Sequence, residues 1–196
     1  MKVLILDTET TGLTLTDEVI ELAWIRVSDS ITEFNKDAVS TYNQRYRPNA
    51  RMNPHAQKVH GIAFRDLLRC PSTKNIDLPE DINYIIGHNI EFDARLLKQS
   101  NIELTLKLNG VKYICTKKLV KVIEKQFKIP FLNHKLDTVI RHYYPDKVHE
   151  LIPEKHEALS DCYKCFLVLQ EVLKLVPAID SWDKLYELQN LFDKTK

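Results

Sequence analysis

Residues 1–13 read MKVLILDTETTGL, and this stretch decides the fold. The apolar run over residues 3–6 is typical of a buried β-strand and leads directly into two carboxylates, Asp7 and Glu9. Side chains two positions apart in an extended chain lie on the same side, so the two negative charges repel each other. By itself the pair is compatible with a helix cap, a turn or a bound cation.

Composition limits the class of protein. The chain has 196 residues, of which 44% are hydrophobic, enough for one well-buried core. Lysine and arginine total 28 against 27 acidic residues, so the net charge is +1 and any contact with nucleic acid must be local. With only four glycines, the chain contains neither a GxGxxG motif nor a P-loop, which argues against a dinucleotide or Walker-type site.

No targeting signal, membrane segment or cysteine motif in the sequence indicates a specialised class of protein. The sequence shows neither a secretory signal nor an apolar run near the roughly 18 residues that span a bilayer, so we expect a cytoplasmic protein without a membrane segment. Cys162 and Cys165 form a C-x-x-C inside an apolar helical pattern, and we expect buried thiols rather than a zinc or redox site.

Hydrophobic periodicity predicts strands early in the chain and helices later. This order is typical of an α/β domain with a mixed central sheet flanked by helices. We expect one domain over residues 1–176 and a short helical tail over 177–196. The predicted strands cover residues 3–6, 19–27 and 84–86, and the region after Tyr42 is expected to be a strand that gives way to a loop. The predicted longer helices cover 93–99, 116–128, 133–144, 156–175 and 182–192.

Two more acids stand where a folded chain usually places apolar residues. Asp93 lies in GHNIEFDARLL, where a helix follows a short buried strand, and Asp161 lies in KHEALSDCYKCFLVL, near the start of the longest apolar helix. Acids are favoured at helix starts, but a cap needs only one carboxylate, which leaves the first pair unexplained. Four converging carboxylates need a hard divalent cation, and Mg²⁺ or Mn²⁺ suits oxygen ligands.

Such a cluster suggests phosphodiester hydrolysis. Two ions roughly 4 Å apart could hold the attacking and leaving oxygens of an in-line displacement. His156 could take the proton of the attacking water, since an imidazole of pKa about 6.5 accepts protons near neutral pH. Five residues separate it from Asp161, a poor spacing for one helix face, so we expect His156 on the loop before the helix.

Three segments in this order, LDTETTGL, GHNIEFDARLL and HEALSDC, resemble the exonuclease motifs of the DnaQ-like superfamily, in its DEDDh branch. The resemblance spans residues 7–161 and includes VHGI between the first two motifs. It implies an RNase H-like fold and 3′-to-5′ removal of mononucleotides with two Mg²⁺ ions, for which Mn²⁺ would substitute. The implied catalytic residues are Asp7, Glu9, Asp93 and Asp161 as metal ligands and His156 as the general base.

The resemblance also implies contacts with the terminal nucleotide. Leu13 is similar to the residue that wedges against the last base, and Phe92 is expected to stack or to line the pocket. The expected substrate-binding residues are Thr10, Thr11, Gly12, Leu13, His60, His88, Asn89 and Phe92.

The segment YICTKKLVK, HEALSDCY and the Trp-containing tail are similar to the bacterial exodeoxyribonuclease X group. Many relatives carry Asp-Thr where this chain has Cys115 and Thr116, which favours this group over proofreading subunits. The group implies an enzyme that accepts single- and double-stranded DNA 3′ ends and serves DNA repair. The modest net charge suits an enzyme that releases DNA after a few steps.

Other functions are less well supported. Related enzymes similar to RNase T and oligoribonuclease act on RNA, and tolerance of a 2′-hydroxyl depends on a few pocket contacts. A proofreading subunit or a repair partner, and the oligomeric state, stay open. A non-catalytic binding module is disfavoured because all four acids and the histidine are present, and an aspartyl phosphatase because Glu9 stands where that chemistry wants a second Asp.

Overall fold

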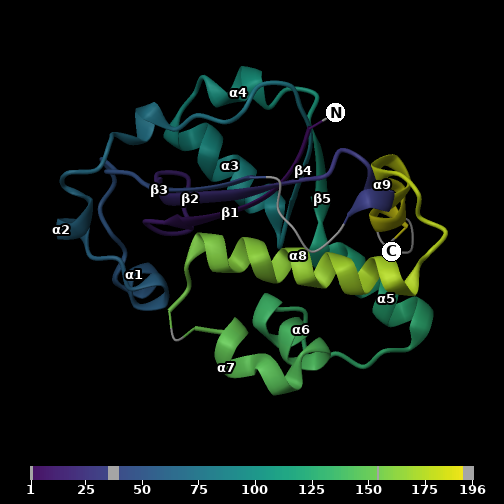
Figure 1. Cartoon of the computed structure of the whole chain (residues 1–196). Helices are drawn as coiled ribbons and strands as arrows, with labels where there is room; N and C mark the ends of the chain where they lie inside the picture. The colour runs from purple at the N-terminus through teal and green to yellow at the C-terminus, as the bar shows by residue number, and fades with distance from the viewer. Residues whose placement is uncertain (1, 35–39, 154, 192–196) are drawn as a thin grey trace.

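The computed structural model describes residues 2–34, 40–153 and 155–191. Five strands form a mixed sheet in the order β3-β2-β1-β4-β5, with antiparallel pairing of β1, β2 and β3 and parallel pairing of β1, β4 and β5 (Figure 1). This arrangement confirms the predicted α/β fold with a mixed central sheet. The strands are β1 (Lys2–Thr10), β2 (Val19–Val27), β3 (Ser40–Arg45), β4 (Ile82–Gly87) and β5 (Lys112–Cys115).

The central strand β1 is longer than predicted. Residues 7–10 are polar, yet they continue the pairing with β2, where Asp7 lies opposite Ala23 and Glu9 opposite Glu21. The expectation that the two acids follow the strand is therefore wrong, because both lie within it. The backbone pairing with β2 fixes the direction in which each acid points.

Alternate residues of β1 face two different cores. Val3 and Ile5 belong to the cluster that includes α8, whereas Leu4 and Leu6 belong to the cluster that includes α3. Figure 1 shows the long helix α8 lying along one face of the sheet. Because a strand alternates with period two, Asp7 and Glu9 continue the series that faces α8.

Helices complete the two layers, and their ends differ by a few residues from the predicted ranges. None of the helices among the described residues is both long and apolar enough to cross a membrane. The helices are α1 (Pro54–His60), α2 (Phe64–Leu67), α3 (Ile90–Ser100), α4 (Leu104–Lys107), α5 (Thr116–Phe127), α6 (Leu136–Tyr143), α7 (Val148–Leu151), α8 (Ala158–Leu175) and α9 (Trp182–Asn190).

The C-terminal helix α9 covers the edge strand β5. The side chain of Gln189 accepts a hydrogen bond from the backbone N–H of Cys115 and donates one to the carbonyl of Tyr113, both at 2.7 Å. These bonds satisfy backbone groups that an edge strand would otherwise leave unpaired. Trp182 is 1% exposed and anchors the start of α9 in the core. The boundary at residue 176 stays a prediction.

We expect Gln189→Leu to lower the free energy of unfolding by roughly 2–4 kcal/mol, because the buried N–H of Cys115 and the partly buried carbonyl of Tyr113 lose their partners. Urea unfolding followed by circular dichroism measures the loss. Glu187→Ala, at an exposed position of the same helix, is the matched control and should stay within about 0.5 kcal/mol of the parent chain. Equal effects of the two substitutions would contradict this role for Gln189.

Candidate active site

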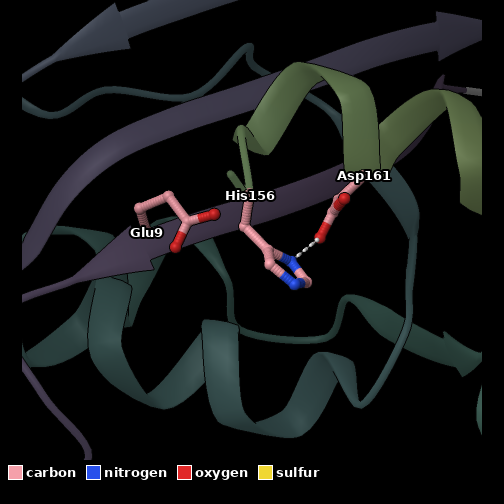
Figure 2. Close-up of side chains that lie close together, drawn as sticks. All are labelled: Glu9, His156 and Asp161. Carbon is pink, nitrogen blue, oxygen red and sulfur yellow. Dashed lines mark hydrogen bonds and ion pairs between the residues drawn. The ribbon is translucent and has the colours of Figure 1, made fainter. Parts of the chain in front are cut away.

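Three segments bring the predicted catalytic residues together. Asp7 and Glu9 come from β1, Asp93 from the first turn of α3 and Asp161 from the first turn of α8. α8 begins at residue 158, which leaves His156 on the preceding loop, as expected. One possible ligand atom each of Glu9, His156 and Asp161 lies within 4.8 Å of the others (Figure 2). The Nδ1 atom of His156 lies 3.0 Å from Oδ2 of Asp161.

Asp93 is fastened to β1 by its neighbour in the strand. Its Oδ1 atom accepts hydrogen bonds from the Thr8 backbone N–H at 3.1 Å and from the Thr8 hydroxyl at 2.7 Å. Gly87, at the end of β4, allows β1 and α3 to approach closely: a Cβ there would lie 2.7 Å from the Leu6 carbonyl oxygen of β1 and 2.8 Å from Cδ1 of Ile90, the first residue of α3. These contacts fix the start of α3 against the central strand.

Burial and mutual repulsion shift the pKa values of the acids upward. Burial, with the negative charge of Asp161, raises the pKa of Glu9 to about 8. Burial raises the pKa of Asp93 to about 7 despite the opposing bonds from Thr8. For Asp7, burial and then the charges of Asp93, Asp161 and Glu9 raise the pKa well above its ordinary value.

Asp161 is the exception among the four acids. Burial opposes its charged form, but the hydrogen bond from His156 and the positive charge of Lys164 outweigh burial and lower the pKa of Asp161. The same hydrogen bond raises the pKa of His156. Ionisation of these clustered acids is therefore unfavourable, and only Asp161 is held in its ionised form. Such a cluster of carboxylate oxygens fits the donor set of a divalent cation.

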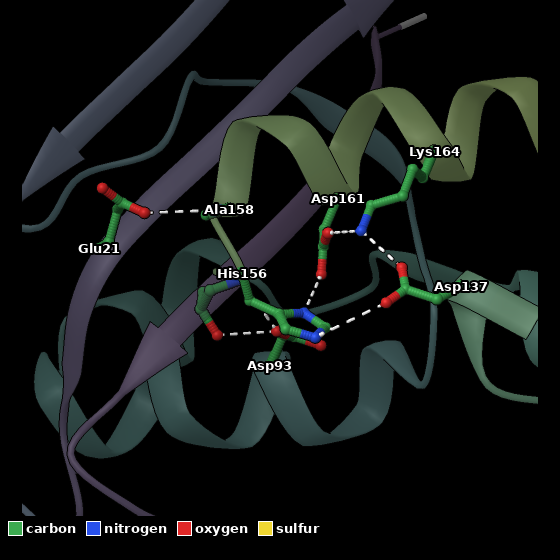
Figure 3. Close-up of polar contacts among 8 residues, drawn as sticks. Glu21, Asp93, Asp137, His156, Ala158, Asp161 and Lys164 are labelled. Carbon is green, nitrogen blue, oxygen red and sulfur yellow. Dashed lines mark hydrogen bonds and ion pairs between the residues drawn. The ribbon is translucent and has the colours of Figure 1, made fainter. Parts of the chain in front are cut away.

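Glu21 was not predicted, yet it fixes the start of α8. Its side chain is 3% exposed, and Oε2 accepts a hydrogen bond from the backbone N–H of Ala158 at 3.1 Å (Figure 3). Oε1 accepts from Nε of Arg45 at 2.9 Å. Glu157, the N-cap residue of α8, makes no side-chain cap, so a residue of β2 supplies it instead. The signal in the sequence is an acid inside the mainly apolar segment VIELAWIRV.

Lys164 was also missed. It lies on the inward face of α8, and its Nζ atom is 2.5 Å from Oδ1 of Asp161 and 2.7 Å from Oδ1 of Asp137, a residue of α6. Oδ2 of Asp137 lies 3.8 Å from Nε2 of His156. The sequence contains a signal for this contact, because the spacing of three residues places Lys164 one helical turn after Asp161.

A cavity of about 280 Å³ opens beside the acids. Its lining includes five of the predicted substrate residues, together with a group from α1 and its N-cap that sequence reasoning missed. The predicted members are Thr10, Gly12, Leu13, His60 and Phe92; those missed are Asn53, His55, Ala56 and Val59.

Three predicted substrate residues lie outside this lining. Thr11 is fully buried, and its hydroxyl donates to Oδ1 of Asp17. The ring nitrogens of His88 contact the Thr116 hydroxyl at 3.0 Å and the His134 carbonyl at 2.7 Å, so this side chain is engaged within the protein. Asn89 is exposed at the N-cap of α3, where its backbone is left-handed with φ of 75°.

A known protein family matches most of the chain, including the segments that carry these residues. The exonuclease family (RNase T) matches the chain over residues 4–169, which includes all four acids and His156. The chain belongs to this exonuclease family. The predicted membership of the DnaQ-like exonucleases is thereby confirmed, and with it the prediction of a nuclease, an enzyme of the hydrolase class. None of the curated protein sequences compared with the chain matches it.

Solved structures share the fold of this exonuclease at low sequence identity. Exonuclease X, in complex with 5′-overhanging duplex DNA, is 21% identical with a TM-score of 0.69, over 95% of this chain and 99% of that one. Escherichia coli exonuclease I, in complex with a 5cy-dT13 oligonucleotide, is 15% identical with a TM-score of 0.71; the match covers 95% of this chain but 42% of that one. Cell-death related nuclease 4 is 18% identical with a TM-score of 0.63, over 89% and 64% of the two chains.

We expect the metal-free exonuclease to lose stability as the pH rises. The folded-state pKa values of Glu9 and Asp93, about 8 and about 7, exceed the ordinary values of 4.5 and 3.8. Protonation of these groups therefore stabilises the folded state fully below the ordinary values, and this contribution is lost as the pH rises through the folded values. Thermal unfolding with chelator should give a lower Tm at about pH 8.5 than at about pH 6.

Addition of Mn²⁺ should reverse this loss. At about 100 times its Kd the ion should stabilise the folded state by about 2.7 kcal/mol, which corresponds to a rise in Tm of roughly 5–10 °C. At one fixed Mn²⁺ concentration the rise should be larger at the higher pH, where fewer protons must leave the ligands and the Kd is lower. A Tm that does not respond to Mn²⁺ at either pH would contradict the metal assignment.

Proposed function

We propose that this protein is a 3′-to-5′ exodeoxyribonuclease that releases nucleoside monophosphates from DNA ends and uses two Mg²⁺ ions, which Mn²⁺ can replace. The observation that carries the proposal is the convergence of four acids, of which Glu9, Asp93 and Asp161 are buried and Asp7 is half-buried, and of His156 beside a cavity with apolar walls. The proposed role of this activity is DNA repair, and the proposed location is the cytoplasm.

Asp7, Glu9, Asp93 and Asp161 would hold the divalent ions. When bound, such ions activate water and stabilise the charge on the departing oxygen. His156 would accept the proton of the attacking water. Its side chain is 40% exposed, and the bond to Asp161 holds the ring beside the acids, so it is open to solvent water.

The cavity would receive the 3′-terminal nucleotide. Leu13 is 76% exposed at its wall, and the Phe92 ring is flanked by the guanidinium of Arg95, 5.2 Å from the ring centroid. Apolar and aromatic side chains of this kind bind bases by stacking without reading their sequence. This arrangement suits an enzyme that removes every nucleotide in turn.

DNA is the proposed substrate because structures that share this fold include an exonuclease with duplex DNA and an exonuclease with a dT13 oligonucleotide. An RNA end would need room for its 2′-hydroxyl, so matched DNA and RNA oligonucleotides discriminate between the two substrates.

Digestion of a 5′-labelled oligonucleotide in Mg²⁺ should give a ladder that shortens from the 3′ end. The ladder should disappear with chelator and in Asp7→Asn, because the ligand set is then incomplete. Immediate release of a short labelled product would instead indicate attack from the 5′ end. Faster digestion of the matched RNA would reassign the enzyme as an exoribonuclease.

We expect His156→Ala to lower kcat by roughly 100- to 10,000-fold, the usual contribution of a general base. Binding of Mn²⁺, measured by calorimetry, should be largely retained because the four acids remain. His149→Ala, at an exposed position of α7, is the control and should keep full activity. Unchanged turnover in His156→Ala would remove this residue as the base.

A further inference from the structure

Lys164 places a positive charge inside the cluster of acids. The residue is 2% exposed, and its ammonium lies between Oδ1 of Asp161 and Oδ1 of Asp137 (Figure 3). The other oxygen of Asp161, Oδ2, contacts Nδ1 of His156. Each oxygen of Asp161 therefore contacts a different nitrogen of the protein.

Packing alone does not explain a lysine at this position. The buried face of α8 is otherwise mainly apolar, and desolvating an ammonium costs several kcal/mol unless its partners are well placed. A buried ion pair is often no more stabilising than an apolar side chain of similar volume. The ammonium is also directed at one of the four acids and not at solvent, which points to a role in the site.

We propose that Lys164 is a positioning residue of the nuclease site: an internal counter-ion that engages Oδ1 of Asp161 and keeps Oδ2 beside His156, in the group that together with Glu9 could hold a divalent cation. Asp137 holds the ammonium from α6 and takes part of its charge. Oδ2 of Asp137 lies 3.8 Å from Nε2 of His156. One chain of contacts therefore positions both the proposed base, His156, and the proposed metal ligand, Asp161. This inference rests on the proposed metal-dependent function.

Two opposite effects follow for Lys164→Met, which keeps the approximate length but removes the charge. Mn²⁺ should bind more tightly, on the order of tenfold, because a positive charge next to a ligand repels a cation. Turnover should nevertheless fall by about 10- to 100-fold, because Asp161 is then free to rotate away from the reactive geometry. A residue that served packing alone would not produce this combination.

The experiment uses the full chain, stripped with chelator and titrated with Mn²⁺ by calorimetry, with kcat measured separately on a DNA oligonucleotide. Val168→Ala, fully buried on the same helix and two turns from Asp161, is the packing control: its Tm should fall while the Kd for Mn²⁺ and kcat stay unchanged. Asp137→Asn should weaken Mn²⁺ binding. The positive charge of Lys164 is then no longer partly neutralised by Asp137 and repels a cation at Asp161 more strongly.

Unchanged or weaker Mn²⁺ binding by Lys164→Met, or a kcat within about twofold of the parent chain, overturns the proposal. If that variant does not fold, Asp137→Asn decides, because unchanged or tighter binding there is equally incompatible with the inference. A parent chain that binds Mn²⁺ but leaves DNA intact refutes the proposed function alone. In that case the opposite shifts in Kd still test the counter-ion.

Discussion

The desolvation and mutual repulsion of four clustered carboxylates, three of them buried and Asp7 half-buried, are the constraint on which the rest of this structure depends. The pairing of β1 with β2 holds Asp7 opposite Ala23 and Glu9 opposite Glu21, so the two acids cannot move apart to relieve the repulsion. The pKa of Glu9, about 8, and that of Asp93, about 7, show how strongly the folded chain resists ionising them. Protons or cations must therefore fill the site, and a nuclease site needs cations that also bind phosphate oxygens.

Each element that carries an acid is tied to its neighbours by a separate polar contact. Thr8 binds Asp93 and so fixes α3, while Glu21 binds the first residue of α8 and fixes its start. Lys164 then holds the Asp161 side chain from the next turn of the same helix. Such contacts matter because catalytic geometry tolerates errors of only about 0.5 Å, and the acids by themselves would spread apart.

Local patterns predicted much of this, and the exceptions have physical causes. The helices follow from a clear 3.6-residue period, and the acids are visible because charge interrupts apolar segments. Strand β5 was missed because KYIC is too short to show an alternation. The roles of Glu21 and Lys164 depend on partners in other segments or on helix orientation. For His88, a neighbouring glycine indicates close approach but does not show that the partners are Thr116 and His134.

The charge distribution also constrains how a DNA end could bind. A net charge of +1 gives little long-range attraction for a polyanion, and the ionised acids repel phosphate at short range. Affinity for a 3′ end must then come from the cavity beside the acids, where Leu13 and Phe92 contribute apolar surface. The scissile phosphate can approach only where cations have reversed the local charge. The pocket and the acidic cluster therefore depend on each other. Stacking in the pocket supplies binding energy that electrostatic attraction does not provide, and cations bound by the acids make the bound end reactive.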